Sequence, residues 1–398
     1  MNQRAVTAWA ISVAIVAIVV SFPRMSGKLY PTFLAAGEHF RNGEPVYGWF
    51  PETQDQYRYS PLVAASFAPW SCLPTPVGAV LWRALQALLL LLSLRAWSRV
   101  TVPQVPWSTL AILSLPLVLG NVYNAQLNPL VLALILGGLA AFASGHFNLA
   151  AAAIAGAAIF KVYPLAIGLL LCTIEPRRFT VRLLVAVAIG MALPFAFHSP
   201  NYVAQQYSDW FARMGVDDRT HLSVHEGYQD FQRLLHAWGV SMELSSYRLM
   251  EVLVGGAMAG WLLLGRRSQS RRGVNIQLVS GLGLVWCTLF GPASESATYM
   301  LLAPVAAQSC GIAARGGWLE RGWVYAAYAL LLSIPIVMWF PSEVSLPYRT
   351  LVPQAHGSLM LLAWIIWRHG SGWWRRPTLG TNQLVVRTLA KTVRRARV

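Results

Sequence analysis

Long apolar runs recur along almost the whole chain, and they constrain its fold more than any other feature. They lie near residues 6–22, 76–94, 105–120, 127–143, 148–160, 163–174, 179–197, 248–265, 275–290, 298–314, 322–340 and 354–368. A helix of about 20 apolar residues crosses a hydrocarbon layer roughly 30 Å thick. Only 12% of the residues are charged, too few to solvate a globule of this size. We therefore predict an all-α integral membrane protein with about 12 transmembrane helices.

Arginine clusters between these runs predict the orientation. The net charge of +16 is carried by arginine, since Lys28, Lys161 and Lys391 are the only lysines. If Met1 is cytoplasmic and each run crosses once, the clusters all fall inside, as the positive-inside rule requires: Arg95 and Arg99, Arg177 and Arg178, Arg266, Arg267, Arg271 and Arg272, and Arg315 and Arg321. We predict one membrane domain, 1–368, with both termini cytoplasmic and a basic tail, 369–398. This pattern indicates membrane topology, not nucleic-acid binding.

Two long segments, 23–75 and 198–247, are predicted as outer loops and hold most of the acidic residues. Within them, Tyr30–Arg41, Tyr202–Met214 and Gly227–Trp238 are expected to form amphipathic helices. Residues 61–73 are apolar but too short to cross, so a re-entrant helix is expected there.

Lys161 is the sharpest candidate for a functional residue. Phe160-Lys161-Val162-Tyr163-Pro164 places the one mid-chain lysine at a span boundary on the predicted outer face. It is either a lysine that snorkels to the interface or a cation for a lipid-linked phosphate. Tyr163 would line the same place.

A polar segment, Asn121 to Pro129, lies between two spans. The amides of Gln126 and Asn128 can donate and accept hydrogen bonds, which suits sugar hydroxyls. They could equally cap a helix in a tight turn. One such residue suffices for a cap and the segment holds four, so we favour a cavity lining.

Other candidates lie in predicted outer turns. Arg58 could clamp a phosphate, and Tyr59 beside it is either a binding residue or an interfacial aromatic. Glu295 lies in a small polar turn that also includes Tyr299, a candidate substrate-binding residue. A partly desolvated carboxylate there would suit general-base work, whereas a solvated turn acid would be structural.

The sequence lacks the usual motifs of soluble enzymes. No phosphate-binding P-loop, HExxH metal site, GxSxG elbow or dinucleotide-binding glycine pattern is present. His221, His225 and His236 share a loop, but their spacing matches no metal template. We therefore predict neither a metal nor a cofactor.

The order of these motifs resembles glycosyltransferase family 87. The residues that carry the resemblance are Phe33-x-Ala35-Ala36, Asn42-Gly43-Glu44-Pro45-Val46-Tyr47, Arg58-Tyr59-Ser60-Pro61, Gln126-Leu127-Asn128, Lys161-Val162-Tyr163-Pro164 and Gly291-Pro292-x-Ser294-Glu295, over about residues 6–315. The resemblance implies a GT-C fold with its active site at the outer membrane face and a polyprenyl-phosphate sugar donor. It also implies that Lys161 and Arg58 lie near the donor phosphate, and Gln126 and Asn128 near the sugar.

One position departs from the family pattern. The family usually has an aspartate, the expected general base, a few residues before the Phe-x-Ala-Ala helix, and by spacing Leu29 occupies that place here. The remaining candidates for the catalytic acid are Glu295, Asp55 and Glu38, and we favour Glu295 because a short turn constrains it.

The sequence therefore predicts a hexosyltransferase of the bacterial cytoplasmic membrane. It would transfer a mannose-like sugar from a polyprenyl-phosphate donor to a lipid or glycan acceptor. Leu29 leaves open a catalytically inactive lipid-binding or assembly protein. A transporter or flippase of lipid-linked sugars is a further alternative, although no internal repeat supports it.

Overall fold

The computed structural model describes residues 3–20, 29–51, 53, 55–101, 105–216, 228–266, 272–292 and 294–374. This part of the chain is predominantly α-helical. Its helices are α1 (Gln3–Val20), α2 (Leu29–Asn42), α3 (Pro61–Phe67), α4 (Thr75–Val100), α5 (Trp107–Tyr123), α6 (Asn128–Ala143), α7 (Phe147–Phe160), α8 (Leu165–Ile174), α9 (Pro176–Ala192), α10 (Pro200–Val216), α11 (Phe231–Ala237), α12 (Leu244–Arg266), α13 (Arg272–Leu289), α14 (Ala303–Ala313), α15 (Trp318–Val337), α16 (Ser342–Thr350) and α17 (Pro353–Trp374). Three short 3-10 helices accompany them: η2 (Trp70–Cys72), η3 (Leu193–Ala196) and η4 (Ser296–Leu302).

The fold is that of an all-α membrane protein, because the described helices carry long apolar surfaces. Four of them are long and apolar enough to cross a membrane alone, namely α1, α4, α9 with η3, and α12, and a bent pair, α16 with α17, could make a fifth. Five further apolar helices are shorter, such as α7 and α8. At 1.5 Å per residue, the 14 residues of α7 extend only about 21 Å. The predicted number of about 12 crossings is therefore not confirmed, although each apolar run contains helix.

The helix α6 lies at the centre of the membrane part, between α4 and α7. Its buried residues occur on every side, as expected for a helix that is apolar all round. A Cβ on Gly138 would lie 3.0 Å from Ile154 of α7, and one on Gly137 would lie 3.4 Å from Ser93 of α4. These close approaches fix α6 and α7 as an antiparallel hairpin. The chain turns at Gly145, whose φ of 83° favours glycine.

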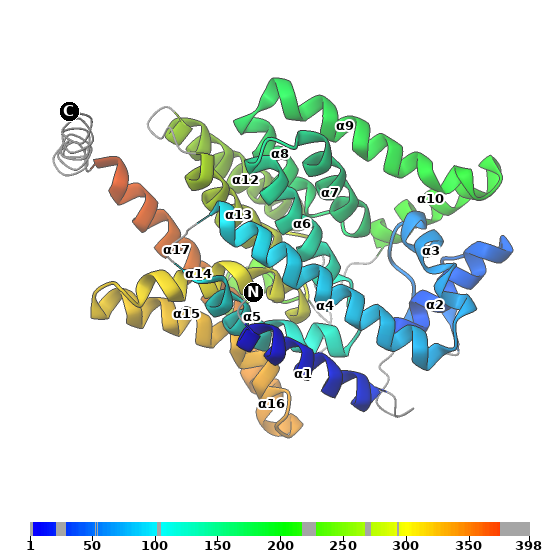
Figure 1. The fold of residues 1–398 in the computed structure, drawn as a ribbon, viewed down its shortest axis with the longest axis horizontal. Helices are drawn as coiled ribbons and strands as arrows, with labels where there is room; N and C mark the ends of the chain where they lie inside the picture. The colour runs from blue at the N-terminus through cyan, green and yellow to red at the C-terminus, as the bar shows by residue number, and fades with distance from the viewer. Residues whose placement is uncertain are drawn as a thin grey trace, which may run out of the picture.

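The predicted amphipathic helices are present. Tyr30–Arg41 corresponds to α2, Tyr202–Met214 to α10, and the described part of Gly227–Trp238 to α11, while Gly227 itself lies outside the described residues. The predicted re-entrant segment forms α3 and η2. Figure 1 shows α2, α3 and α10 grouped at one side of the molecule, where Val46 N–H donates to Gln206 Oε1 at 2.9 Å.

Two elements were not predicted from the sequence. A two-residue antiparallel pair, β1 (Trp49–Phe50) and β2 (Asp55–Gln56), lies in the first predicted outer loop. The second unpredicted element is the polar helix α16, which precedes α17.

The predicted basic tail is described only at its start. The helix α17 continues into it as far as Trp374, and residues 375–398 lie outside the described residues.

Candidate active site

Several helix ends meet around Asn128, the first residue of α6. Its side chain is fully buried, and Nδ2 donates to Asn121 Oδ1 at 2.9 Å and to the Ala297 carbonyl at 3.1 Å. Its Oδ1 accepts the hydroxyl of Tyr163 at 3.2 Å. Asn128 therefore ties the end of α5 and the segment after α7 to η4. These bonds occupy both amide hydrogens, so its main effect is to position its neighbours.

Lys161 lies directly beside this junction. It follows the last residue of α7 in extended backbone conformation, with φ of −148° and ψ of 132°. The ammonium lies 5.7 Å from the ring centroid of Tyr163 and 6.0 Å from that of Tyr59, both within cation–π range. Lys161 is half-buried, and this burial lowers the pKa of its ammonium, while the carboxylate of Glu295 opposes the shift. A half-desolvated cation is thus held among two tyrosines and an acid.

The segment before α3 is anchored to the end of α7. The buried Ser60 hydroxyl donates to the Ile159 carbonyl at 2.9 Å, two residues before Lys161. The Tyr59 carbonyl accepts the hydroxyl of Tyr47 at 2.7 Å. These two bonds hold the Tyr59 ring beside Lys161, although 102 positions separate the two residues in the sequence (59 to 161).

Glu295 is the N-cap residue of the 3-10 helix η4. Its N–H donates to Thr298 Oγ1 at 3.2 Å, and Thr298 N–H donates back to the Glu295 carbonyl at 2.8 Å. The preceding turn packs tightly, because a Cβ on Gly291 would lie 2.2 Å from the Cys287 carbonyl and 3.2 Å from Tyr163 Cβ. A short, packed turn thus fixes the backbone of Glu295 next to Tyr163.

Asp230 lies next to this turn, and sequence reasoning did not single it out. Gln229 N–H donates to the Ser294 carbonyl at 2.7 Å, and the buried Tyr299 hydroxyl donates to the Gln229 carbonyl at 2.5 Å. Asp230 caps α11 by accepting Arg233 N–H at 2.9 Å. Burial raises the pKa of Asp230 to about 6. An aspartate before an apolar helix was a visible cap signal, but its burial depends on contacts with residues far along the chain.

The other two predicted acids each form an ion pair with an arginine. Asp55 and Arg58 form an ion pair with each other, with Asp55 Oδ1 2.9 Å from Arg58 Nη1. Arg58 Nη1 also donates to the Gln56 carbonyl at 3.0 Å. Glu38 is exposed on α2 and pairs with Arg41 at 3.7 Å.

Two further predicted positions are found in or near helix ends. Gln126 lies half-buried in the turn before α6, and Ala125 beside it has a φ of 53°, a strained value for a residue with a Cβ. Leu29, where the family usually has an aspartate, is the first residue of α2 and packs partly buried against the apolar cluster of α2 and α3.

The described residues include no group of three histidine, cysteine or acidic side chains that could hold a metal. His221 and His225 lie outside them. The assembled side chains can therefore supply a cation, tyrosine hydroxyls, amides and a carboxylate. This set suits binding of a phosphate and proton transfer to or from a hydroxyl.

Apolar helices with charged and polar side chains gathered at their ends are compatible with either a membrane-embedded enzyme or a membrane-embedded binding protein. Comparison with known families decides between these classes. A sequence model of glycosyltransferase family 87 matches residues 57–292, more than half of the chain. The protein belongs to glycosyltransferase family 87 and is a membrane glycosyltransferase. No curated protein matches it.

The extent of the match separates the predicted residues into two groups. The matched region includes Arg58, Tyr59, Gln126, Asn128, Lys161 and Tyr163. It starts after Glu38 and Asp55 and ends before Glu295 and Tyr299. The match therefore covers every predicted binding residue except Tyr299, and none of the predicted catalytic acids.

Proposed function

We propose that this membrane glycosyltransferase moves a mannose-like hexose from a polyprenyl-phosphate donor to a lipid or glycan acceptor. We place the reaction at the outer face of a bacterial cytoplasmic membrane, with both termini in the cytoplasm. Family membership supports sugar transfer, and the apolar helices support a membrane location. The absence of a dinucleotide-type glycine pattern from the sequence fits a donor that is a lipid rather than a nucleotide.

The observation that carries this proposal is the setting of Lys161. Its ammonium is half-buried between Tyr59 and Tyr163 at the end of a short apolar helix. A snorkelling lysine would reach freely toward water, whereas this one is surrounded by residues from three separate segments. A desolvated cation stabilises a developing phosphate charge more strongly than a solvated one does. Lys161 therefore holds the donor phosphate in our proposal.

The reaction uses one cation and one carboxylate. The acceptor hydroxyl oxygen attacks the anomeric carbon of the sugar, and the carboxylate takes the hydroxyl proton. The bond between that carbon and the phosphate oxygen breaks, and its electron pair leaves with the polyprenyl phosphate, which Lys161 stabilises. Glu295 is our choice for the carboxylate because its charge acts on Lys161. Tyr163 and Asn128 position the lysine, and Gln126 contacts the sugar.

Replacing the lysine tests this assignment. Lys161→Ala should lower sugar transfer by about 10²–10³-fold in membranes supplied with labelled polyprenyl-phosphate hexose, the usual cost of removing one transition-state contact. Lys161→Arg should retain part of the activity because the charge remains. The matched control is Arg99→Ala, an exposed cation at the end of α4. Full transfer by well-expressed Lys161→Ala would remove the lysine from the mechanism.

Replacing the acids one at a time identifies the base. Glu295→Gln should abolish proton transfer and lower the rate by about 10²–10⁴-fold. Asp55→Asn and Glu38→Gln should have smaller effects, because these acids pair with Arg58 and Arg41. Glu343→Gln, in the polar helix α16, is the control. If only Asp55→Asn abolishes transfer, the base is Asp55.

The position of Leu29 motivates a second candidate function, a lipid-binding or assembly protein without transferase activity. It predicts that the wild-type protein and all three acid variants bind polyprenyl phosphate equally but transfer no sugar. A flippase would instead move lipid-linked sugar between leaflets of vesicles without forming a glycosidic bond.

A further inference from the structure

The end of the molecule opposite Lys161 contains a second cationic site. A cavity of about 390 Å³ is lined by residues of the α6–α7 turn and by Arg182 of α9: Gly145, His146, Phe147, Asn148, Leu149 and Arg182. This cavity lies at the start of α7, and Lys161 follows the last residue of the same helix. The cavity and Lys161 are therefore about 21 Å apart, which is the length of α7. The cavity therefore does not belong to the proposed transferase site.

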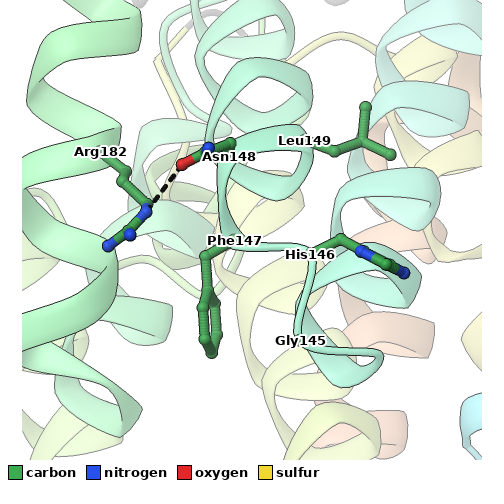
Figure 2. A pocket seen from close by; sticks show the side chains of 6 residues that line it. All are labelled: Gly145, His146, Phe147, Asn148, Leu149 and Arg182. Atoms are coloured by element: carbon green, nitrogen blue, oxygen red, sulfur yellow. Dashed lines mark hydrogen bonds between the residues drawn. The ribbon is translucent and has the colours of Figure 1, made fainter.

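Arg182 is held in place within this cavity. Its Nε donates to Asn148 Oδ1 at 2.7 Å, and Nη1 donates to the Arg178 carbonyl. Figure 2 shows Arg182 reaching from α9 toward Asn148, while His146 points to the opposite side of the turn. The two bonds use Nε and Nη1, so the orientation of the guanidinium is fixed while Nη2 remains available. A fixed guanidinium is well suited to phosphate oxygens.

The N-terminus of α7 adds positive potential at this cavity. The helices α7 and α9 run parallel, because Arg182 in the first half of α9 contacts Asn148 at the start of α7, and a Cβ on Gly190 would meet Ile159 near their ends. The first turn of α7 contains no acidic residue, so its free N–H groups and dipole favour an anion. The N-terminus of α9 contributes less, because Glu175 is its N-cap and Pro176 has no N–H. A neighbouring cavity of about 440 Å³ is lined by Glu175, Pro176, Arg177 and Arg178.

An apolar stripe continues from the cavity along α9. Val185 and Ile189 follow Arg182 at helical spacings of three and seven residues, so all three share one face. The side chains of Val185 and Ile189 are 51% and 61% exposed, respectively. A free phosphate ion would gain nothing from these side chains, whereas an acyl chain would cover them.

We propose that this cavity binds the phosphodiester headgroup of an anionic phospholipid of the leaflet opposite the transferase site. The phosphate pairs with Arg182 and the first turn of α7, and an acyl chain lies along Val185 and Ile189. The bound lipid holds α7 and α9 together at the end remote from Lys161. This site does not depend on the proposed sugar transfer.

Lipid retention by the purified full chain tests the proposal. The protein is exchanged into detergent with phosphatidylglycerol or phosphatidylcholine, and native mass spectrometry counts the lipid that stays bound. The wild type should retain phosphatidylglycerol in preference to phosphatidylcholine. Arg182→Gln should bind phosphatidylglycerol roughly tenfold more weakly, because a charge-assisted contact is lost. Arg99→Gln, an exposed cation outside the cavity, should behave as the wild type.

A second variant and a competitor complete the experiment. Asn148→Ala removes the side chain that orients Arg182 and should weaken retention less than Arg182→Gln does, which keeps the test informative if the latter fails to fold. An excess of inorganic phosphate should leave the lipid bound. The proposal is overturned if Arg182→Gln or Asn148→Ala retains phosphatidylglycerol as the wild type does, or if Arg99→Gln loses as much of it as Arg182→Gln. It is also overturned if the wild type retains phosphatidylcholine as strongly as phosphatidylglycerol, or if inorganic phosphate alone displaces the lipid.

Discussion

At the scale of residues, the site is organised by side chains that hold one another. Asn128 and Tyr163 bond each other at 3.2 Å, and the ring of Tyr163 lies beside Lys161. The sequence predicted Lys161 and Tyr163 because a lysine beside a helix-breaking proline is unusual in an apolar chain. It could not predict the pairing of Asp55 with Arg58, or the burial of Asp230. Both depend on where the folded outer segment packs.

Asp230 predicts a pH dependence of stability. Burial raises its pKa from 3.8 to about 6, so the folded state binds this proton more tightly than the unfolded state. The folded protein therefore loses stability as the pH rises from about 4 to 6, by at most about 3 kcal/mol. Asp230→Asn keeps an oxygen that can cap α11 and removes the charge. It should raise the unfolding temperature at pH 7.5 but not at pH 4.

Thermal unfolding in detergent, followed by tryptophan fluorescence at both pH values, measures this difference. Glu343→Gln provides the comparison, because Glu343 is a solvent-exposed acid in the first turn of α16. A stability difference between Asp230→Asn and the wild type that is the same at pH 4 and pH 7.5 would contradict the burial of a charged Asp230.

At the scale of elements, most helices could be predicted, and their lengths could not. Each apolar run forms helix because its backbone groups must pair internally in lipid. Whether a run crosses the membrane depends on its straight length, and α8 has only 10 residues. The polar helix α16 was missed because Pro347 interrupts its sequence and no apolar periodicity marks it.

The tight packing of Gly291, just after α13, leaves no room for a side chain. Gly291→Ala should destabilise the protein by about 1–3 kcal/mol, because its Cβ would overlap the Cys287 carbonyl and press on Tyr163. Sugar transfer should fall as well, since the Lys161 neighbourhood moves. Gly256→Ala on α12 is the matched control, because a Cβ there meets nothing within 4 Å. Chemical denaturation of both variants measures the difference, and equal stability of the two would contradict the close packing.

At the scale of the whole molecule, two cationic sites lie at opposite ends of the same short helix, α7. One is the Lys161 neighbourhood and the other is the Arg182 cavity. The arrangement follows from the topology, because α6, α7 and α8 reverse direction at each turn. The arginine clusters in the sequence predicted which end faces the cytoplasm, but nothing in them indicated that Arg182 is held by Asn148.

The native cysteines allow this orientation to be tested without introducing new cysteines. Cys72 is exposed in η2, in the predicted outer segment, whereas Cys287 and Cys310 are buried. A membrane-impermeant maleimide should therefore label the wild type in intact cells, and Cys72→Ser should remove most of the label. Labelling of Cys72 that appears only after the cells are permeabilised would place this segment in the cytoplasm.

The most direct test is a structure with a non-transferable polyprenyl-phosphate sugar analogue bound. Our account predicts the phosphate oxygens within roughly 3 Å of Lys161 Nζ, the distance of a charge-assisted hydrogen bond. It also predicts the anomeric carbon facing Glu295. If the phosphate of the analogue is bound away from Lys161, for example in the Arg182 cavity, the account is contradicted.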